Sequence, residues 1–334
     1  MAMIALASTD GLSREDWLAY RNLGIGGSDA SVVCGINKYK SPIQLWMEKT
    51  GQLPPEEAGE AAYWGTRLES AVREEFTLRT GIKVLPVNQI LQSREYPFML
   101  ANVDGVCRCS THGKCIFEAK TANAFKAGEW EGDSVPQEYI LQIQHYLCVT
   151  GYSGAYIATL IGGNTFQWKF VERDEEIISI LIKYERDFWA HVQDDVPPAL
   201  DGSEACAKFL SQQYPHSIPL SKAILPDNAA DLIRQYSEAD EQLDALTKQK
   251  QKAANLLKQM LGENEMGIVG DDYIKWLTVS QERFNAKLLQ AEQPEIYAKY
   301  TVKSSHRRFT IKVAKTDDGS NTQYQLLQLL REVG

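Results

Sequence analysis

The sequence predicts an α/β fold with a mixed central sheet flanked by helices, followed by a C-terminal extension of one long helix and a small β element. Apolar residues alternate with period two in short runs between residues 83 and 172, which favours strands. Runs with apolar positions three and four residues apart predict the helices. The 334-residue length suggests about two domains, and Pro197-Pro198 marks the division. We expect a core over residues 1–198 and an extension over residues 199–334.

The core is expected to contain strands over residues 83–87, 90–91, 100–107, 115–120, 154–161 and 164–172. Helices are expected over residues 63–79, 136–147 and 174–193. Between the strands at 100–107 and 115–120, residues 111–114 (Thr-His-Gly-Lys) predict a tight hairpin turn. This hairpin would place the ends of the two strands side by side.

Asp104, Glu118 and Lys120 form the pattern most typical of a chemical site. Side chains alternate between the faces of a strand, so Glu118 and Lys120 would point one way and Ala119 the other. The hairpin would bring Asp104, on the preceding strand, beside Glu118. Mg²⁺ prefers carboxylate oxygens, and a lysine can stabilise charge on a phosphodiester. Alone, the pattern is also that of a turn aspartate and a surface Glu-Lys pair.

The flanking helices offer further candidates. Glu69 borders the apolar face of its helix, where a carboxylate is costly unless it meets a cation or a metal; otherwise it reaches solvent at the edge of that face. Tyr139, Gln142 and Tyr146 follow one another about one helical turn apart. Gln142 could hold a water or the scissile phosphate, or simply make a hydrogen-bonded contact between helices.

The composition of the chain indicates the cellular compartment in which the protein is expected. The first ten residues lack the basic start and apolar core of a secretory signal, and no apolar run approaches the ~20 residues of a membrane span. The six cysteines, at positions 34, 107, 109, 115, 148 and 206, fit a reduced compartment. We therefore expect a cytoplasmic protein without a membrane partner.

One cysteine cluster allows a different interpretation. Cys107, Cys109, His112 and Cys115 are four possible zinc ligands, although the same segment must also form the hairpin turn. An iron–sulfur cluster with a C-terminal cysteine group is not expected, because no cysteine follows Cys206.

The extension combines a long helix with a basic segment. Over residues 226–261, apolar positions alternate spacings of four and three, which predicts either a coiled-coil partner or packing within the extension. Residues 267–279 predict a hairpin turning at Gly270-Asp271-Asp272, and 309–313 a further strand, within a basic β-containing segment over 267–315. Residues 273–315 hold nine Lys or Arg against three Glu, although the whole chain has a net charge of −9. This segment could bind the duplex backbone or form a solvated surface.

A series of short motifs occurs in a fixed order through residues 14–195: RNLGIGGSDA at 21–30, YKSP at 39–42, LW at 45–46, WGTRLE at 64–69, VDG at 103–105, EAK at 118–120, QIQ at 142–144 and VTG at 149–151. In this order they resemble the YqaJ-type viral recombinases, relatives of phage lambda exonuclease within the PD-(D/E)XK nuclease superfamily. The resemblance implies a restriction-endonuclease-like core.

The resemblance also implies roles for single residues. Asp104, Glu118 and Glu69 match metal-ligand carboxylates, Glu69 often acting through water, with the Ala119 carbonyl as a further ligand. Lys120 matches the catalytic lysine and Gln142 the catalytic glutamine. The expected contacts to DNA and to a 5′-terminal phosphate come from Arg21, Ser28, Asn102, Tyr139 and Tyr146. Glycines at 24, 26 and 27 would let the backbone approach the phosphate, with free amides at a helix start. Asn102 departs from the small hydroxyl residue of some relatives.

The function implied by the resemblance is a Mg²⁺-dependent 5′→3′ exonuclease that acts on double-stranded DNA ends. Mn²⁺ would substitute for Mg²⁺, with one or two ions per site. The products would be 5′-mononucleotides and a 3′ overhang for a phage single-strand annealing protein. Family members form ring-shaped homotrimers, and the gene would belong to a phage or prophage in a bacterial host.

Two alternatives differ in class from this function. A structure-specific endonuclease would use the same site, but Arg21 and Ser28 favour the recognition of an end. A non-catalytic DNA-binding scaffold would be favoured by a missing carboxylate or lysine, and Asp104, Glu118 and Lys120 are all present. The extension could guide DNA, dock the annealing protein or stabilise an oligomer.

Overall fold

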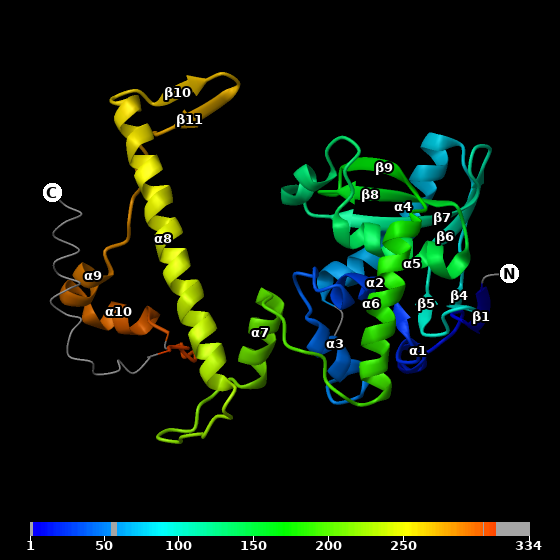
Figure 1. Cartoon of the computed structure of the whole chain (residues 1–334). Helices are drawn as coiled ribbons and strands as arrows, with labels where there is room; N and C mark the ends of the chain where they lie inside the picture. Colours follow the sequence, from blue (N-terminus) through cyan, green and yellow to red (C-terminus); the bar gives the residue numbers. More distant parts are fainter. Residues whose placement is uncertain (1–2, 55–58, 303, 312–334) are drawn as a thin grey trace. The chain divides into compact units, whose positions relative to one another are not determined.

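The computed structural model describes residues 3–54, 59–302 and 304–311 (Figure 1). The chain forms two compact units, Met1–Tyr214 and Pro215–Gly334. The predicted division at residue 198 precedes helix α7 (Glu204–Gln213), whose Cys206 and Phe209 are buried with residues of the first unit. Packing of this helix therefore moves the boundary to residue 214.

The first unit contains two mixed β-sheets, which confirms the predicted α/β class. One sheet has the order β1-β4-β5-β2, in which only β2 and β5 are parallel: β1 (Met3–Ser8), β4 (Gln89–Ser93), β5 (Met99–Ala101) and β2 (Ile25–Gly26). The other has the order β3-β6-β7-β8-β9, in which only β7 and β8 are parallel: β3 (Val84–Leu85), β6 (Gly105–Cys109), β7 (Gly113–Ala122), β8 (Gly154–Ile161) and β9 (Thr165–Glu172).

The predicted strand over 100–107 is wrong in one respect, because the chain leaves the first sheet after Ala101 and enters the second at Gly105. Asp104 therefore lies in the break before β6 rather than on a strand. Gly105 permits this crossing, since a Cβ there would stand 2.6 Å from a methyl of Val84 and 3.0 Å from the Leu85 carbonyl oxygen. The hairpin is confirmed: β6 and β7 are antiparallel, with Cys109 opposite Gly113.

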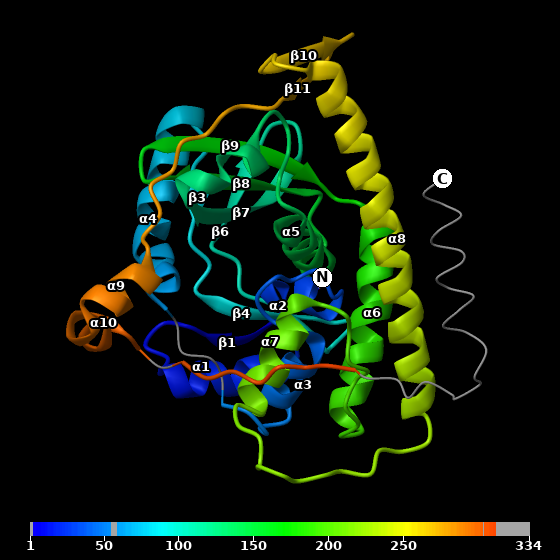
Figure 2. The same ribbon diagram turned by 90° about the vertical axis from the view of Figure 1, so that its left-hand side faces the viewer.

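Helices cover both faces of the five-stranded sheet (Figure 2). On one face α4 (Glu60–Thr80) buries Val72 and Phe76 against Phe117. On the other face α5 (Gln137–Thr150) buries Ile143 and Leu147 in a core that includes Ile116 of β7 and residues of β4 and β5. Helix α5 therefore contacts both sheets, and the period of two along β7 decides which side chains face it.

The first unit contains further helices. They are α1 (Arg14–Arg21), α2 (Gly27–Val33), α3 (Pro42–Lys49), the 3₁₀ helix η1 (Ala124–Trp130) and α6 (Glu175–Gln193). Phe188 of α6 is buried with Trp46 of α3 and Val32 of α2. Asp174 caps α6 by accepting hydrogen bonds from the backbone N–H groups of residues 176 and 177.

The second unit contains α8 (Ala229–Leu261), the β10–β11 hairpin (Met266–Val269 and Asp272–Lys275), α9 (Ala286–Glu292) and α10 (Pro294–Tyr300). The hairpin confirms the predicted turn near Gly270. The apolar seam of α8 is exposed at Leu232, Tyr236, Leu243, Leu246, Leu257 and Met260, and its coiled-coil pairing stays a prediction. Residues 309–311 form no strand, and the rest of the predicted strand lies outside the described residues.

Among the helices of residues 3–54, 59–302 and 304–311, none combines the length and the hydrophobicity that a membrane span requires.

Candidate active site

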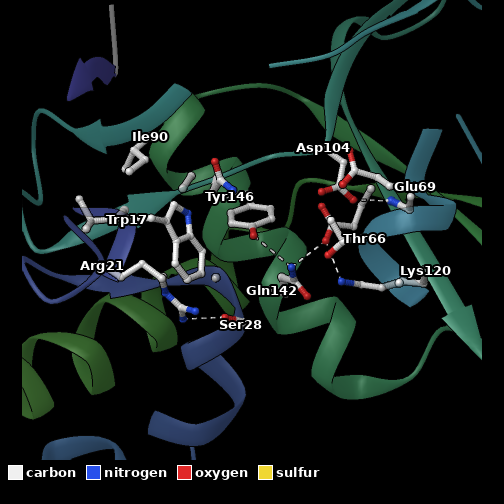
Figure 3. Close-up of a pocket in the computed structure, with 18 of the residues that line it drawn as sticks. Trp17, Arg21, Ser28, Thr66, Glu69, Ile90, Asp104, Lys120, Gln142 and Tyr146 are labelled. Atoms are coloured by element: carbon white, nitrogen blue, oxygen red, sulfur yellow. Dashed lines mark hydrogen bonds and ion pairs between the residues drawn. The ribbon is translucent and has the colours of Figure 1, made fainter. Parts of the chain in front are cut away.

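A cavity of about 420 Å³ lies where α1, α2, α4 and α5 meet the two sheets (Figure 3). The predicted site residues that line it are Arg21, Ser28, Glu69, Asn102, Asp104, Glu118, Ala119, Lys120, Gln142 and Tyr146. Tyr139 lines a neighbouring cavity instead. The fold therefore gathers at one place residues that are more than a hundred positions apart in the sequence.

Glu118 is the centre of one end of the cavity. Its Oε1 accepts a hydrogen bond of 2.7 Å from Nζ of Lys120 and another of 2.7 Å from Nε2 of Gln142. The side chains of Glu118 and Lys120 lie on the α5 side of β7, as the strand period predicts, while Ala119 packs toward α4. Glu118 is only 2% exposed, and among the described residues its Oε2 has no hydrogen-bond partner. A buried oxygen without a partner would be stabilised by a cation.

Asp104 is oriented by the backbone of β7. Its Oδ2 accepts a 2.8 Å hydrogen bond from the Ala119 N–H, which ties the break before β6 to the next strand. Glu69 approaches from α4, with Oε1 3.4 Å from Nη1 of Arg73. Arg73 also lies 3.5 Å from the Asp104 carbonyl oxygen and so links α4 to this loop.

The carboxylates at this end repel one another in a partly dry environment. Burial, together with the charge of Asp104, raises the pKa of Glu118 to about 8 and that of Glu69 to about 7. Burial also raises the pKa of Asp104. For Lys120, burial lowers the pKa, but the charges of Glu118 and Asp104 outweigh it and raise the pKa, so its ammonium stays charged.

Carboxylate-rich donor sets suit Mg²⁺, and the unpartnered Oε2 of Glu118 fits a cation. Within the described residues, however, no three His, Cys, Asp or Glu side chains stand close enough together to hold a metal ion. The three carboxylates thus line one cavity without converging on a single point. In the described part of the chain, Cys107, Cys109, His112 and Cys115 do not gather as possible metal ligands either. The His112 ring stacks on Phe170 with 4.0 Å between ring centroids, and Sγ of Cys109 accepts a hydrogen bond from the His112 N–H.

The other end of the cavity carries Arg21 and Ser28. Nη2 of Arg21 donates to Oγ of Ser28 at 3.1 Å, and its guanidinium lies over the Trp17 ring at 5.0 Å. The same Nη2 lies 3.0 Å from Oδ1 of Asp29. Oδ2 of Asp29 in turn lies 3.0 Å from Nζ of Lys49, which also donates to the Arg21 carbonyl oxygen at 2.8 Å. A buried ion network therefore holds the arginine.

Two expectations for the glycine motif are wrong in detail. The Gly26 N–H donates to Oδ2 of Asp29, so it is not free for an anion. A Cβ on Gly27 would stand 2.3 Å from the Tyr146 ring, and one on Gly24 would stand 2.5 Å from the Phe98 carbonyl oxygen. These two glycines allow close packing of the protein against itself.

Tyr146 joins the two ends of the cavity. Its ring packs on Gly27, and its hydroxyl accepts a 3.1 Å hydrogen bond from Nε2 of Gln142, which also holds Glu118. Burial raises the pKa of Tyr146 well above its usual value, so it remains protonated.

Sequence reasoning did not single out Trp17, Asp29, Lys49 or Arg73. Trp17 and Arg21 are four residues apart on α1, a spacing that could have suggested their contact.

Comparisons with known proteins give the family. Residues 16–153 match the model of the YqaJ-like viral recombinase domain. The chain is 42% identical over 311 residues to the uncharacterized protein YqaJ of Bacillus subtilis (strain 168), covering 92% of this chain and 97% of that protein. It is 27% identical over 146 residues to the uncharacterized protein R354 of Acanthamoeba polyphaga mimivirus, covering 41% of this chain and 26% of that protein.

Among solved structures, an alkaline exonuclease (LHK-Exo) from Laribacter hongkongensis matches 60% of this chain and 97% of its own, with 20% identity and a TM-score of 0.47. The long and close match to the Bacillus subtilis protein, together with the domain match, shows that this chain belongs to the YqaJ-like viral recombinase family.

Proposed function

We propose that this protein is a Mg²⁺-dependent 5′→3′ exonuclease that removes 5′-mononucleotides from double-stranded DNA ends. One observation carries the proposal: a single cavity has three carboxylates, a lysine and a glutamine at one end and a partly exposed arginine, held by a buried aspartate, at the other. The first group suits hydrolysis of a phosphodiester, and the second suits a terminal phosphate. Membership of a viral recombinase family agrees with an enzyme that acts on DNA.

The hydrolytic roles follow from the contacts. Asp104 and Glu118, with Glu69 through water and the Ala119 carbonyl, are the groups that would hold one or two Mg²⁺ or Mn²⁺ ions. A bound metal lowers the pKa of water and neutralises charge on the phosphate. Lys120 stays charged and is held by Glu118, so it would stabilise the charge that develops on the phosphate oxygens. Gln142 fixes Glu118 and would help to orient the attacking water.

The other end of the cavity supports digestion from a 5′ end. A guanidinium binds phosphate through charge-assisted hydrogen bonds, and Ser28 adds a hydroxyl beside it. Asn102 borders the same cavity and could contact the strand. A 5′-phosphate held there would place the next phosphodiester toward Lys120, so that one nucleotide would leave per cleavage.

The proposal extends to partners. The 3′ overhang left by such an enzyme is the substrate of a single-strand annealing protein, which we propose as the partner in phage recombination. We also propose a homo-oligomeric ring, trimeric as the resemblance implies, around the duplex. The cytoplasm of a bacterial host is the expected compartment.

Linear duplex DNA, labelled separately at the 5′ and 3′ ends, tests this function beside a closed circular control. We expect Mg²⁺-dependent release of the 5′ label first, no cleavage in EDTA and an intact circle. A cut circle would favour a structure-specific endonuclease. Binding without any cleavage would favour a non-catalytic scaffold.

A further inference from the structure

A second cavity, of about 240 Å³, adjoins the candidate active site. Ser28, Lys120 and Gln142 line both cavities. Ser28 belongs to the end with Arg21, whereas Lys120 and Gln142 belong to the end with Glu118. The second cavity therefore opens along the stretch between the two ends.

The position of this opening matters for a bound nucleotide. If the terminal phosphate is at Arg21 and Ser28 and the scissile phosphodiester is at Lys120, the sugar must lie between them. The base must then leave the line of the backbone to one side. The second cavity is the adjoining space that borders both phosphate positions. It is smaller than the roughly 300–1,000 Å³ of pockets that hold whole ligands, which suits a base alone.

The side chains that line this cavity suit a planar, polar ring. Tyr39 is 67% exposed, and Nζ of Lys126 both donates to its hydroxyl at 3.2 Å and lies 5.6 Å from its ring centroid. Tyr139 also lines this cavity; its ring centroid lies 5.7 Å from that of Trp130 and 4.9 Å from Nζ of Lys120.

The loop that carries Tyr39 is fixed rather than free. Oδ1 of Asn37 accepts hydrogen bonds from the N–H groups of Tyr39 and Lys40 at 2.9 and 3.0 Å. Nδ2 of Asn37 donates to Oγ of Ser31 on α2 at 3.0 Å. Asn37 thus ties the loop to the helix that carries Ser28, which sets the position of Tyr39 relative to the phosphate end.

We propose that this second cavity is the subsite for the base of the 5′-terminal nucleotide, with Tyr39 as its stacking surface. The inference rests on the proposed exonuclease function and deepens it. Stacking on an aromatic ring accepts all four bases, because each has a π face, and an exonuclease must accept each base in turn. Lys126 would hold the ring in place for stacking and add positive charge near the strand.

The subsite is tested by comparing the wild-type protein and the Tyr39→Ala variant on two substrates. The substrates are 5′-phosphorylated duplexes whose terminal nucleotide is either normal or abasic. For the wild-type protein, loss of the base should lower kcat/KM about 5- to 100-fold, the range expected for one base–aromatic stack. For Tyr39→Ala, the two substrates should differ by less than about twofold, since the stack is already gone.

Matched variants separate the ring from the fold. Tyr39→Phe keeps the ring and should retain the base dependence. Tyr184→Ala removes an exposed tyrosine of α6 that lines neither cavity and should behave as wild type. The subsite is overturned if the wild-type protein digests both substrates equally, or if Tyr39→Ala keeps the full base dependence.

A binding measurement separates this inference from the proposed function. A duplex with 5′-terminal 2-aminopurine is mixed with the Asp104→Asn variant, in which hydrolysis should be absent. Stacking of the terminal base on Tyr39 should quench the 2-aminopurine fluorescence. The double variant Asp104→Asn/Tyr39→Ala should show no such quenching. Quenching that survives Tyr39→Ala would overturn the subsite whether or not the protein is a nuclease. A wild-type protein that binds DNA with Tyr39-dependent quenching but never cleaves would overturn only the exonuclease.

Discussion

Asp29 holds Arg21 from inside the protein: Oδ1 of Asp29 lies 3.0 Å from Nη2 of Arg21, and the aspartate is only 5% exposed. Burial acts to raise the pKa of Asp29, but the charges of Lys49 and Arg21 and the Gly26 N–H outweigh it, so the pKa lies below its usual range. The carboxylate is therefore ionised at neutral pH and holds one edge of the guanidinium beside Ser28.

We predict that Asp29→Asn weakens the preference for 5′-phosphorylated ends several-fold. It should also cost about 3–5 kcal/mol of stability, because it leaves the Lys49 ammonium buried without its partner. The double variant Asp29→Asn/Lys49→Met removes that buried charge and should recover much of the stability, but not the preference. The measurements are urea unfolding and the ratio of kcat/KM on phosphorylated and hydroxyl ends. A preference that returns with stability would show that Asp29 only supports the fold.

Arg21→Ala should slow digestion of 5′-phosphorylated ends by about 10- to 100-fold, the range for loss of a hydrogen bond to a charged group. Digestion of 5′-hydroxyl ends should change much less, because no terminal phosphate is present. Arg21→Lys should recover only part of the activity, since an ammonium lacks the planar pair of donors. Steady-state kinetics on the two substrates check this. Equal slowing on both ends would remove Arg21 from the phosphate site.

Metal binding should depend on pH through the carboxylates. The pKa values of Glu69 and Glu118 are raised to about 7 and about 8, above the ordinary value of 4.5. Groups with raised pKa values contribute stability below pH 4.5 that is lost as the pH rises through 7 and 8. Mg²⁺ competes with those protons, so it should raise the Tm more at pH 8.5 than at pH 6.

A thermal shift series with and without Mg²⁺ measures this effect. Glu118→Gln should abolish most of the Mg²⁺-dependent shift, whereas Glu185→Gln, on α6 outside the cavity, should change the basal Tm but keep the shift. A Mg²⁺ effect of equal size at both pH values would contradict the role of these carboxylates as ligands.

Gly27→Ala should destabilise the protein by about 1–3 kcal/mol, the usual cost of overpacking a core, because its Cβ would stand 2.3 Å from the Tyr146 ring. Gly26→Ser is the matched control: a Cβ there meets nothing closer than 3.7 Å, and serine suits the cap position of α2. Chemical unfolding of the two variants gives the comparison. If both lose the same stability, the contact with Tyr146 is not the cause.

Local patterns predicted most of the elements. The strand over 154–161 appears with the predicted limits because its residues form a nearly continuous apolar run and the chain turns at both ends. The hairpin and the shared face of Glu118 and Lys120 follow from the period of a strand. The break at residues 102–104 could not be predicted, because the sequence there still alternates between polar and apolar residues. Only the close packing of β3 against Gly105 indicates that the chain changes sheets at this point.

The same distinction applies to the site. Short motifs singled out Asp104, Glu118 and Lys120, and the fold brings these residues into one cavity, while their chemical roles stay predictions. The ion pairs that hold Arg21 could not be predicted. Lys49 is 28 residues from Arg21 in the sequence, and the burial of Lys49 against Asp29 depends on how α3 packs. The division at residue 214 was missed for a similar reason. The side chains Cys206 and Phe209 of α7 are buried against residues of the first unit that are distant in the sequence.

The most direct test of the central claim is a product assay on linear, 5′-phosphorylated duplex with wild type, Asp104→Asn and Lys120→Ala. The wild-type protein should release deoxynucleoside 5′-monophosphates in Mg²⁺. Both variants should lose at least about a hundredfold in rate, as expected when a group that stabilises transition-state charge is removed, yet keep DNA binding. Wild-type release of monophosphates that persists in either variant would contradict the assignment of this cavity as the hydrolytic site.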